Sequence, residues 1–311
     1  MRSQLGPSLM LRGEHRNMGD LAAPQRPKYL ETFVRVSGHR MRFVQAGDGF
    51  PVVLVHGFGL GNTGELAWGK VIPGLAERFH VYAPDLLGFG ASDKPLIRYS
   101  PQAHVDQLMS LIDSLCLERV FLMGNSVGGY ITTKCALDHP DRILGVCAIA
   151  SSTIARAMGI DGPETPGLAM MRDFNGTADA MRAFLREVTH NPENITDDIV
   201  ARRLANANDP QIAAANKIFQ DYSRSVARER REWQRFSLVH RLPDSQMPMT
   251  VIWGKNDRFA PVELGYDLER RLPEVQFHYL ENAGHTCQQD QPDRIVEIAT
   301  AFFERTLAES H

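Results

Sequence analysis

One serine of this 311-residue chain lies in a pattern that favours nucleophilic chemistry. The segment GNSVG at residues 124–128 directly follows an apolar run and directly precedes a stretch of helical character. In a sharp turn from a strand to a helix, the two glycines permit close backbone contacts and the serine hydroxyl projects from the sheet. Because glycine and serine are common, an ordinary turn is the alternative. The flanking strand and helix favour Ser126 as a nucleophile that attacks an acyl carbon.

A serine hydroxyl is a weak nucleophile at neutral pH, so it needs a base within reach and a carboxylate that orients the base. When such a serine follows a central strand, the acid and the histidine follow later strands in that order. Asp257 comes just after the apolar run 250–253, and His285 comes just after the run 275–280. We therefore predict that His285 moves the proton and that Asp257 holds the histidine.

Other acids and histidines compete for these two roles. Asp290 and Glu281 lie close to His285 in the sequence, and the chain has eleven histidines in all. Asp257 alone has the expected strand in front of it, and only His285 follows a late strand through a glycine. The sequence therefore favours Asp257 and His285.

The segment HGFG at residues 56–59 ends another apolar strand and predicts donors for a negatively charged intermediate. A preorganised donor to such an oxyanion contributes about 2.7–4 kcal/mol. The backbone N–H groups of Phe58 and Val127 are the candidates, and His56 is expected to hold the loop through its side chain. Asn125 either directs its amide into the pocket or stabilises the turn, and the sequence leaves both open.

Short apolar runs separated by helical or loop stretches predict the framework that positions these residues. Unbroken apolar strands are covered on both faces, which is typical of a parallel sheet. Such runs occupy residues 51–55, 81–83, 120–123, 143–149, 249–253 and 275–280. A hairpin is expected over 31–36 and 41–46, and helices over 101–115, 128–139 and 295–307. The predicted fold class is α/β, with a mostly parallel twisted sheet flanked by helices.

The residue composition changes between about residues 155 and 239, where the apolar strand runs disappear and Met, Ala, Arg and Glu recur at helical spacing. We expect residues 155–239 to form a helical cap subdomain, inserted into a core made of residues 28–154 and 240–311. Thr196 is placed to cap one of its helices. Residues 1–27 are expected to be a flexible N-terminal lead.

Composition excludes several classes of function. The formal net charge is −3, and Lys and Arg are spread along the chain, so no nucleic-acid partner is expected. The four cysteines form no CxxC pair and no zinc-like spacing, which predicts free thiols and no metal site. The N-terminus is too charged for a signal peptide, and no apolar stretch approaches the ~20 residues of a membrane span. We expect a cytoplasmic protein that does not associate with membranes.

Cofactor binding is also not expected. The segment GFGASD at residues 88–93 resembles part of the glycine-rich motif that binds dinucleotides, but it lacks the third glycine of that motif and does not begin a convincing helix. We predict no cofactor and a small-molecule substrate. A homo-oligomer is possible, and the sequence does not decide this point.

Several segments, taken in order, resemble the α/β-hydrolase superfamily. They are HGFG at 56–59, DLLGFGASDKP at 85–95, GNSVGG at 124–129, WGKND at 253–257 and AGH at 283–285. The resemblance extends from residue 28 to the C-terminus. It implies the α/β-hydrolase fold and the activity of a serine hydrolase.

Within that superfamily, the chain is similar to the meta-cleavage product hydrolases, which cut carbon-carbon bonds in vinylogous diketones from aromatic degradation. The similar segments are the GNS turn, DRF at 257–259 and NITDDIVARR at 194–203. This resemblance implies that Arg203 binds the dienoate end of a substrate and that Asn125 contacts the substrate. The position after the histidine, usually tryptophan in that family, is Thr286 here.

The first expectation for the reaction is hydrolysis of a carboxylic ester or lactone through an acyl-enzyme. Hydrolysis of a carbon-carbon bond in a 2-hydroxy-6-oxo-dienoate by the same residues is the alternative. A small-molecule receptor built on the hydrolase fold is the third hypothesis, which slow or single turnover would indicate.

Overall fold

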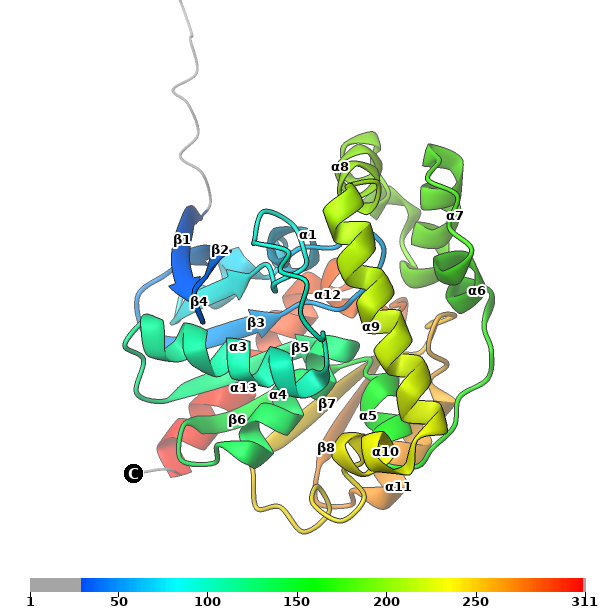
Figure 1. The fold of residues 1–311 in the computed structure, drawn as a ribbon. Helices are drawn as coiled ribbons and strands as arrows, with labels where there is room; N and C mark the ends of the chain where they lie inside the picture. The colour runs from blue at the N-terminus through cyan, green and yellow to red at the C-terminus, as the bar shows by residue number, and fades with distance from the viewer. Residues whose placement is uncertain (1–28, 310–311) are drawn as a thin grey trace, which may run out of the picture.

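The computed structural model describes residues 29–309, so the expected lead at residues 1–27 lies outside them. Eight strands form one sheet in the order β1-β2-β4-β3-β5-β6-β7-β8 (Figure 1). The pairs β1-β2 and β2-β4 are antiparallel, and all other neighbours are parallel. The strands are β1 Leu30–Val36, β2 His39–Ala46, β3 Phe50–Val55, β4 Phe79–Pro84, β5 Val120–Asn125, β6 Ile143–Ile149, β7 Met249–Gly254 and β8 Gln276–Leu280. The predicted fold class is confirmed.

The antiparallel end of the sheet begins with the predicted hairpin. Ser37 and Gly38 form its two-residue turn, with φ angles of 50° and 85°. Positive φ at both turn residues matches the right-handed twist of the strands, and glycine adopts it without steric cost. The strand β2 begins at His39, two residues before the start that alternation suggested.

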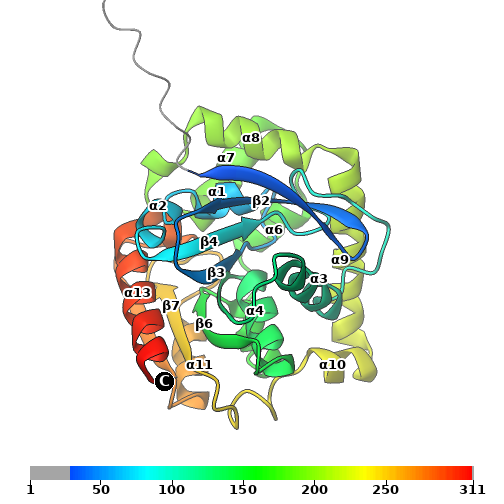
Figure 2. The same ribbon diagram turned by 90° about the vertical axis from the view of Figure 1, so that its left-hand side faces the viewer.

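The central strands are wholly buried because helices cover both faces of the sheet. Figure 2 shows α3 (Pro101–Ser114) and α4 (Val127–Asp138) on one side and α13 (Pro292–Glu309) on the other. The side chain of Ser100 caps α3 by accepting from the Ala103 N–H. Shorter helices lie in the connections: α1 Gly64–Trp68, α2 Ile72–Leu75, α5 Ser152–Ala157, α11 Glu263–Arg271 and α12 Cys287–Asp290.

Five helices between α5 and β7, which we call the cap helices, lie where the sequence predicted an inserted helical segment. They are α6 Pro166–Arg172, α7 Ala178–Val188, α8 Asp197–Ala207, α9 Pro210–Arg228 and α10 Arg230–Phe236. Thr196 accepts from the Ile199 N–H at the start of α8, as predicted. In Figure 1, helices α6 to α9 stand together at the upper right, beside the sheet. No helix within residues 29–309 is long and apolar enough to cross a lipid bilayer.

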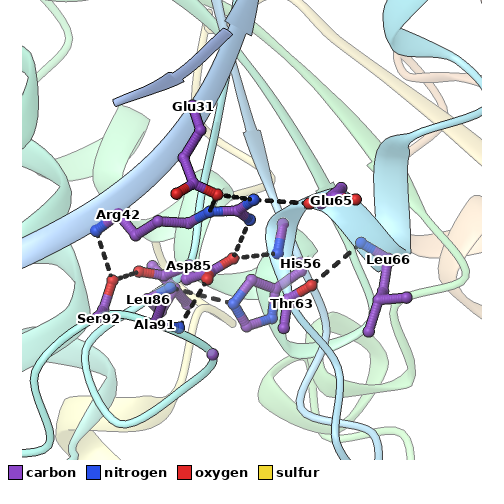
Figure 3. A network of polar contacts seen from close by, with 12 residues as sticks. Glu31, Arg42, His56, Thr63, Glu65, Leu66, Asp85, Leu86, Ala91 and Ser92 are labelled. Carbon is purple, nitrogen blue, oxygen red and sulfur yellow. Dashed lines mark hydrogen bonds and ion pairs between the residues drawn. The ribbon is translucent and has the colours of Figure 1, made fainter. Parts of the chain in front are cut away.

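A network of ion pairs around the buried Arg42 connects β1 and β2 to α1 and to the loop after β4 (Figure 3). Arg42 of β2 is 6% exposed and pairs with Glu31 of β1 at 2.8 Å, with Glu65 of α1 at 2.6 Å and with Asp85 at 3.4 Å. A charge removed from water in this way is stable only when its partners are in place.

Asp85, which follows β4, connects this network to the backbone at the start of α1 and in the loop after β4. Its Oδ1 accepts from the Gly64 N–H at 2.8 Å, and its Oδ2 accepts from the Ala91 N–H at 3.0 Å. Its backbone oxygen accepts from the Ser92 hydroxyl at 2.6 Å. Asp85 therefore fixes the start of α1, and with it the loop that connects β3 to α1.

We predict that Asp85→Ala lowers the free energy of unfolding by about 3 kcal/mol, because it removes one of the three carboxylates around the buried Arg42 and leaves two backbone N–H donors without their acceptor. The measurement is urea unfolding followed by circular dichroism. Arg78→Gln, which breaks an exposed ion pair with Glu304, is the matched control and should change stability by less than about 1 kcal/mol. Equal effects of both changes would contradict a structural role for Asp85.

Candidate active site

Ser126 lies in the turn between β5 and α4, with φ 57° and ψ −123°. A side chain rarely adopts this conformation, so the surrounding packing has to hold it. A Cβ atom at Gly124 would lie 2.3 Å from the Gly128 carbonyl oxygen, and one at Gly128 would lie 2.3 Å from the Val55 carbonyl oxygen. Only glycine fits at both positions. The sharp strand-to-helix turn expected from GNSVG is therefore present.

The main chain of Ser126 is anchored on both sides. Its N–H donates to the Ile149 oxygen at 2.8 Å, and its carbonyl oxygen accepts from the Ser151 hydroxyl at 2.6 Å. Ile149 is the last residue of β6, the neighbouring strand, and Ser151 caps the helix α5 that follows it. These bonds stabilise the strained turn, and the residue lines a cavity beyond the carboxyl ends of the central strands.

His285 and Asp257 are joined directly. The imidazole Nδ1 lies 2.9 Å from Asp257 Oδ2, and both side chains are buried. Asp257 Oδ1 accepts from the Phe259 and Ala260 N–H groups at 2.9 and 2.7 Å. A carboxylate held in this way only accepts, so it places the imidazole proton on Nδ1 and leaves Nε2 as a base.

The competing acids have other partners. Asp290 accepts from the backbone N–H groups of His190, Asn191 and Gly284. Glu281 is exposed and pairs with Lys255. The structure therefore brings Asp257, and neither competitor, to the imidazole.

Ser126 and His285 line the same cavity, which has a volume of about 340 Å³. Within residues 29–309 the Ser126 hydroxyl forms no hydrogen bond, so the cavity brings the two side chains together without joining them. Such contacts are often long in empty sites and shorten when a substrate binds. No group of three or more His, Cys, Asp or Glu side chains in the described part of the chain is placed to hold a metal ion.

The loop after β3 lies against the serine. A Cβ atom at Gly57 would lie 3.0 Å from Ser126 Cβ, so the glycine allows close approach. The N–H groups of Phe58 and Val127, the predicted oxyanion donors, have no acceptor among residues 29–309. Both residues line the cavity beside Ser126. Val127 also begins α4, where the helix dipole favours negative charge.

His56 holds this loop and does not line the cavity. Its Nδ1 lies 2.9 Å from the Gly57 oxygen and its Nε2 accepts from the Leu86 N–H at 3.1 Å (Figure 3). These partners place the proton on Nδ1. Complete burial lowers the pKa of His56, so the ring is neutral at pH 7. These contacts support the structural role expected for it.

Asn125 connects the serine turn with the histidine loop. Its amide nitrogen donates to the Ile149 oxygen at 3.2 Å and to the His285 oxygen at 3.1 Å. The residue also lines the cavity. Of the two roles that the sequence left open, these contacts support stabilisation of the turn, and the amide nitrogen is occupied.

Arg203 of α8 lines the same cavity and is 5% exposed. Its Nε donates to the Leu60 oxygen at 2.8 Å, and within residues 29–309 no carboxylate pairs with it. Burial lowers the pKa of Arg203 to about 10, which leaves the guanidinium charged at pH 7. A buried charge without a counter-ion is costly, and this one faces a cavity that a ligand can enter.

Sequence reasoning missed one further charged residue of this cavity, Arg156 of α5. Arg156 belongs to no recognisable motif. One signal in the sequence could have identified it: it follows the end of β6 by a few residues, and open parallel sheets place their sites beyond the carboxyl ends of the strands.

Thr286 stands beside His285 and contacts the cap. Its N–H donates to the Val188 oxygen at 2.9 Å, and its hydroxyl lies 3.1 Å from the Thr189 hydroxyl. The loop that carries the imidazole is thereby bound to the end of α7.

Comparison with known proteins identifies the family. The family model described as alpha/beta hydrolase fold matches residues 51–292. The 2-hydroxymuconate semialdehyde hydrolase of Pseudomonas sp. strain CF600 is 27% identical over 90% of this chain and 96% of its own length. The 2-hydroxy-6-oxo-6-(2'-aminophenyl)hexa-2,4-dienoic acid hydrolase of Metapseudomonas resinovorans is 26% identical over 89% of this chain and 92% of its own.

A solved structure agrees with these matches. The 2-hydroxy-6-oxo-6-phenylhexa-2,4-dienoate hydrolase of Rhodococcus sp. strain RHA1 superposes with a TM-score of 0.77 at 25% identity. The match covers 89% of this chain and 99% of that one. The family match spans more than half of the chain, and the fold and the order of its motifs agree with it. The protein is a hydrolase that belongs to the α/β-hydrolase family.

Proposed function

We propose that the protein hydrolyses a carbon-carbon bond in a 2-hydroxy-6-oxo-dienoate, with Ser126 as nucleophile, His285 as base and acid, and Asp257 as the group that orients the histidine. The observation that carries the proposal is the buried Arg203 in the cavity of Ser126, which has no carboxylate partner among residues 29–309. An ester or lactone, the first expectation from sequence, would use the same three residues.

The substrate carboxylate supplies the anion that Arg203 lacks. A guanidinium binds a carboxylate through two parallel N–H donors, and the bond is stronger where water is excluded. The Nε of Arg203 is occupied by Leu60, which orients the group and leaves its terminal nitrogens for a ligand. A simple neutral ester would leave this charge uncompensated.

The first half of the reaction forms an acyl-enzyme. His285 Nε2 takes the proton of the Ser126 hydroxyl as the oxygen attacks the ketone carbon distant from the carboxylate. The N–H groups of Phe58 and Val127 bind the resulting oxyanion. His285 stays protonated beside the Asp257 carboxylate, which stabilises the imidazolium.

Breaking a carbon-carbon bond needs a place for the bonding electron pair. In the keto form of the substrate, the pair moves along the conjugated chain to the carbonyl oxygen beside the carboxylate, and a proton from His285 completes the 2-hydroxydienoate product. Water, deprotonated by His285, then hydrolyses the acyl-enzyme and releases the second acid. Arg203 holds the end of the substrate that accepts the electrons.

The names of the relatives support the same reaction. The two sequence relatives described above are named as hydrolases of 2-hydroxymuconate semialdehyde and of an aminophenyl hexadienoic acid. A 2-hydroxy-6-oxo-2,4-heptadienoate hydrolase of Pseudomonas putida is 26% identical over 86% of this chain. These compounds share the conjugated acid that Arg203 would bind.

We predict that Ser126→Ala and Asp257→Asn each lower kcat for dienoate cleavage by on the order of 10⁴-fold, because the first removes the nucleophile and the second reverses the imidazole tautomer. Stopped-flow absorbance of the yellow dienolate measures the rate. Glu281→Gln is the control, since the Glu281 side chain is exposed and pairs with Lys255 outside the cavity, and it should retain the parental rate. A parental rate in Asp257→Asn would overturn the proposed relay.

Arg203→Gln separates the two candidate reactions. We predict that it lowers kcat/KM for the dienoate by about 100-fold, because the carboxylate loses a charged partner, and that it changes p-nitrophenyl butyrate hydrolysis by less than about threefold. The neighbouring Arg202→Gln, which breaks an exposed pair with Glu65, is the control and should leave both rates unchanged. Ester turnover by the parent protein without any loss of dienolate absorbance would instead favour an esterase.

A further inference from the structure

A second arginine lies in the cavity of Ser126 and also has no acidic partner in the part of the chain that the structure describes. Arg156 of α5 donates to the Ser223 hydroxyl at 3.4 Å, and its guanidinium lies 5.6 Å from the centre of the Phe236 ring. Glu232, the acid on the adjoining helix α10, pairs with Arg98 and Arg235 instead. No Asp or Glu of the described chain lines this cavity.

The order of the strands places the two arginines on opposite sides of the nucleophile. Arg203 contacts Leu60 in the loop after β3, Ser126 follows β5, and Arg156 lies in the helix after β6. Because β5 lies between β3 and β6, the serine stands between the two positive groups. Figure 1 shows α9 running from beside α8, which carries Arg203, down past α5.

Three further polar residues of the cavity lie on the two helices that Arg156 and Ser223 connect. Ser152 and Thr153 precede Arg156 by about one turn of α5, and Gln220 precedes Ser223 by about one turn of α9. All three line the cavity, and their side chains have no hydrogen-bond partner among residues 29–309. Most of the other lining residues are apolar, with Phe236 and Leu264 among them. A few polar groups in an apolar cavity are the usual means by which a protein fixes the orientation of a ligand.

We infer that Arg156, assisted by these hydroxyl and amide groups, binds a second carboxylate of the substrate. This inference rests on the proposed function and names the substrate class, a dicarboxylate. One carboxylate pairs with Arg203, the reacting ketone lies at Ser126, and the second carboxylate lies beyond the ketone at Arg156. Hydrolysis consumes one water and releases the 2-hydroxydienoate together with a dicarboxylic acid, formed when the acyl group leaves Ser126.

Two substrates that differ only at the far end test this inference. Both are 2-hydroxy-6-oxo-dienoates, one with a carboxyethyl group on the ketone and one with a propyl group, which has similar size and no charge. We expect the parent protein to favour the carboxyethyl compound in kcat/KM by about tenfold or more. Arg156→Gln should abolish this preference through KM, and Arg156→Lys should retain part of it.

Arg228→Gln is the matched control, because Arg228 is exposed on α9 and does not line the cavity. It removes one positive charge from the surface and should keep the full preference. An Arg156→Gln protein that retains the preference, or a parent protein without one, overturns the inference while leaving the proposed carbon-carbon cleavage intact.

Binding without turnover distinguishes this inference from the proposed reaction. Calorimetric titration of the Ser126→Ala protein with the same two compounds should show tighter binding of the carboxyethyl compound, and the Ser126→Ala, Arg156→Gln double variant should bind both equally. If the parent cleaves neither compound but this difference in affinity is present, the anion site is upheld and the proposed reaction fails. Equal affinities in Ser126→Ala overturn the anion site whatever the rates are.

Discussion

The close packing of backbone at the turn around Ser126 is the constraint on which the site depends. The main chain passes so near to β3 and to its own first helical turn that neither Gly124 nor Gly128 can carry a side chain. The strained φ of Ser126 is then held by hydrogen bonds to Ile149 and Ser151 at the end of β6. The loop after β3, the nucleophile and the end of β6 thus form one rigid unit.

Positive potential is the second property of the site. The start of α4, the N–H groups of Phe58 and Val127 and two arginines lie at a cavity that no Asp or Glu of residues 29–309 lines. In a low-dielectric enclosure these fixed donors interact strongly with anions and do not need to reorganise. The same arrangement stabilises a substrate that is an anion before the reaction begins, and an intermediate that carries an additional negative charge on its oxyanion.

The sequence predicted those parts of the site that follow strands. Ser126, Asp257 and His285 each come within five residues of the end of an apolar run, so the convergence of their strands at one edge could be expected from the pattern alone. The burial of Arg203 could not be derived from spacing, because it depends on how α8 packs over the loop at Leu60. Likewise, the sequence shows that Asn125 precedes the nucleophile, but only tertiary packing reveals that its amide nitrogen reaches the His285 carbonyl.

The contacts of Thr286 with Val188 and Thr189 have a consequence for protein engineering. A chimaera that received its cap from a relative would inherit a different anchor for the imidazole loop, even if all three residues of the proposed relay were retained. Transplanting substrate preference between members of this family by exchanging caps therefore requires the exchanged segment and the residue after the histidine to be chosen together.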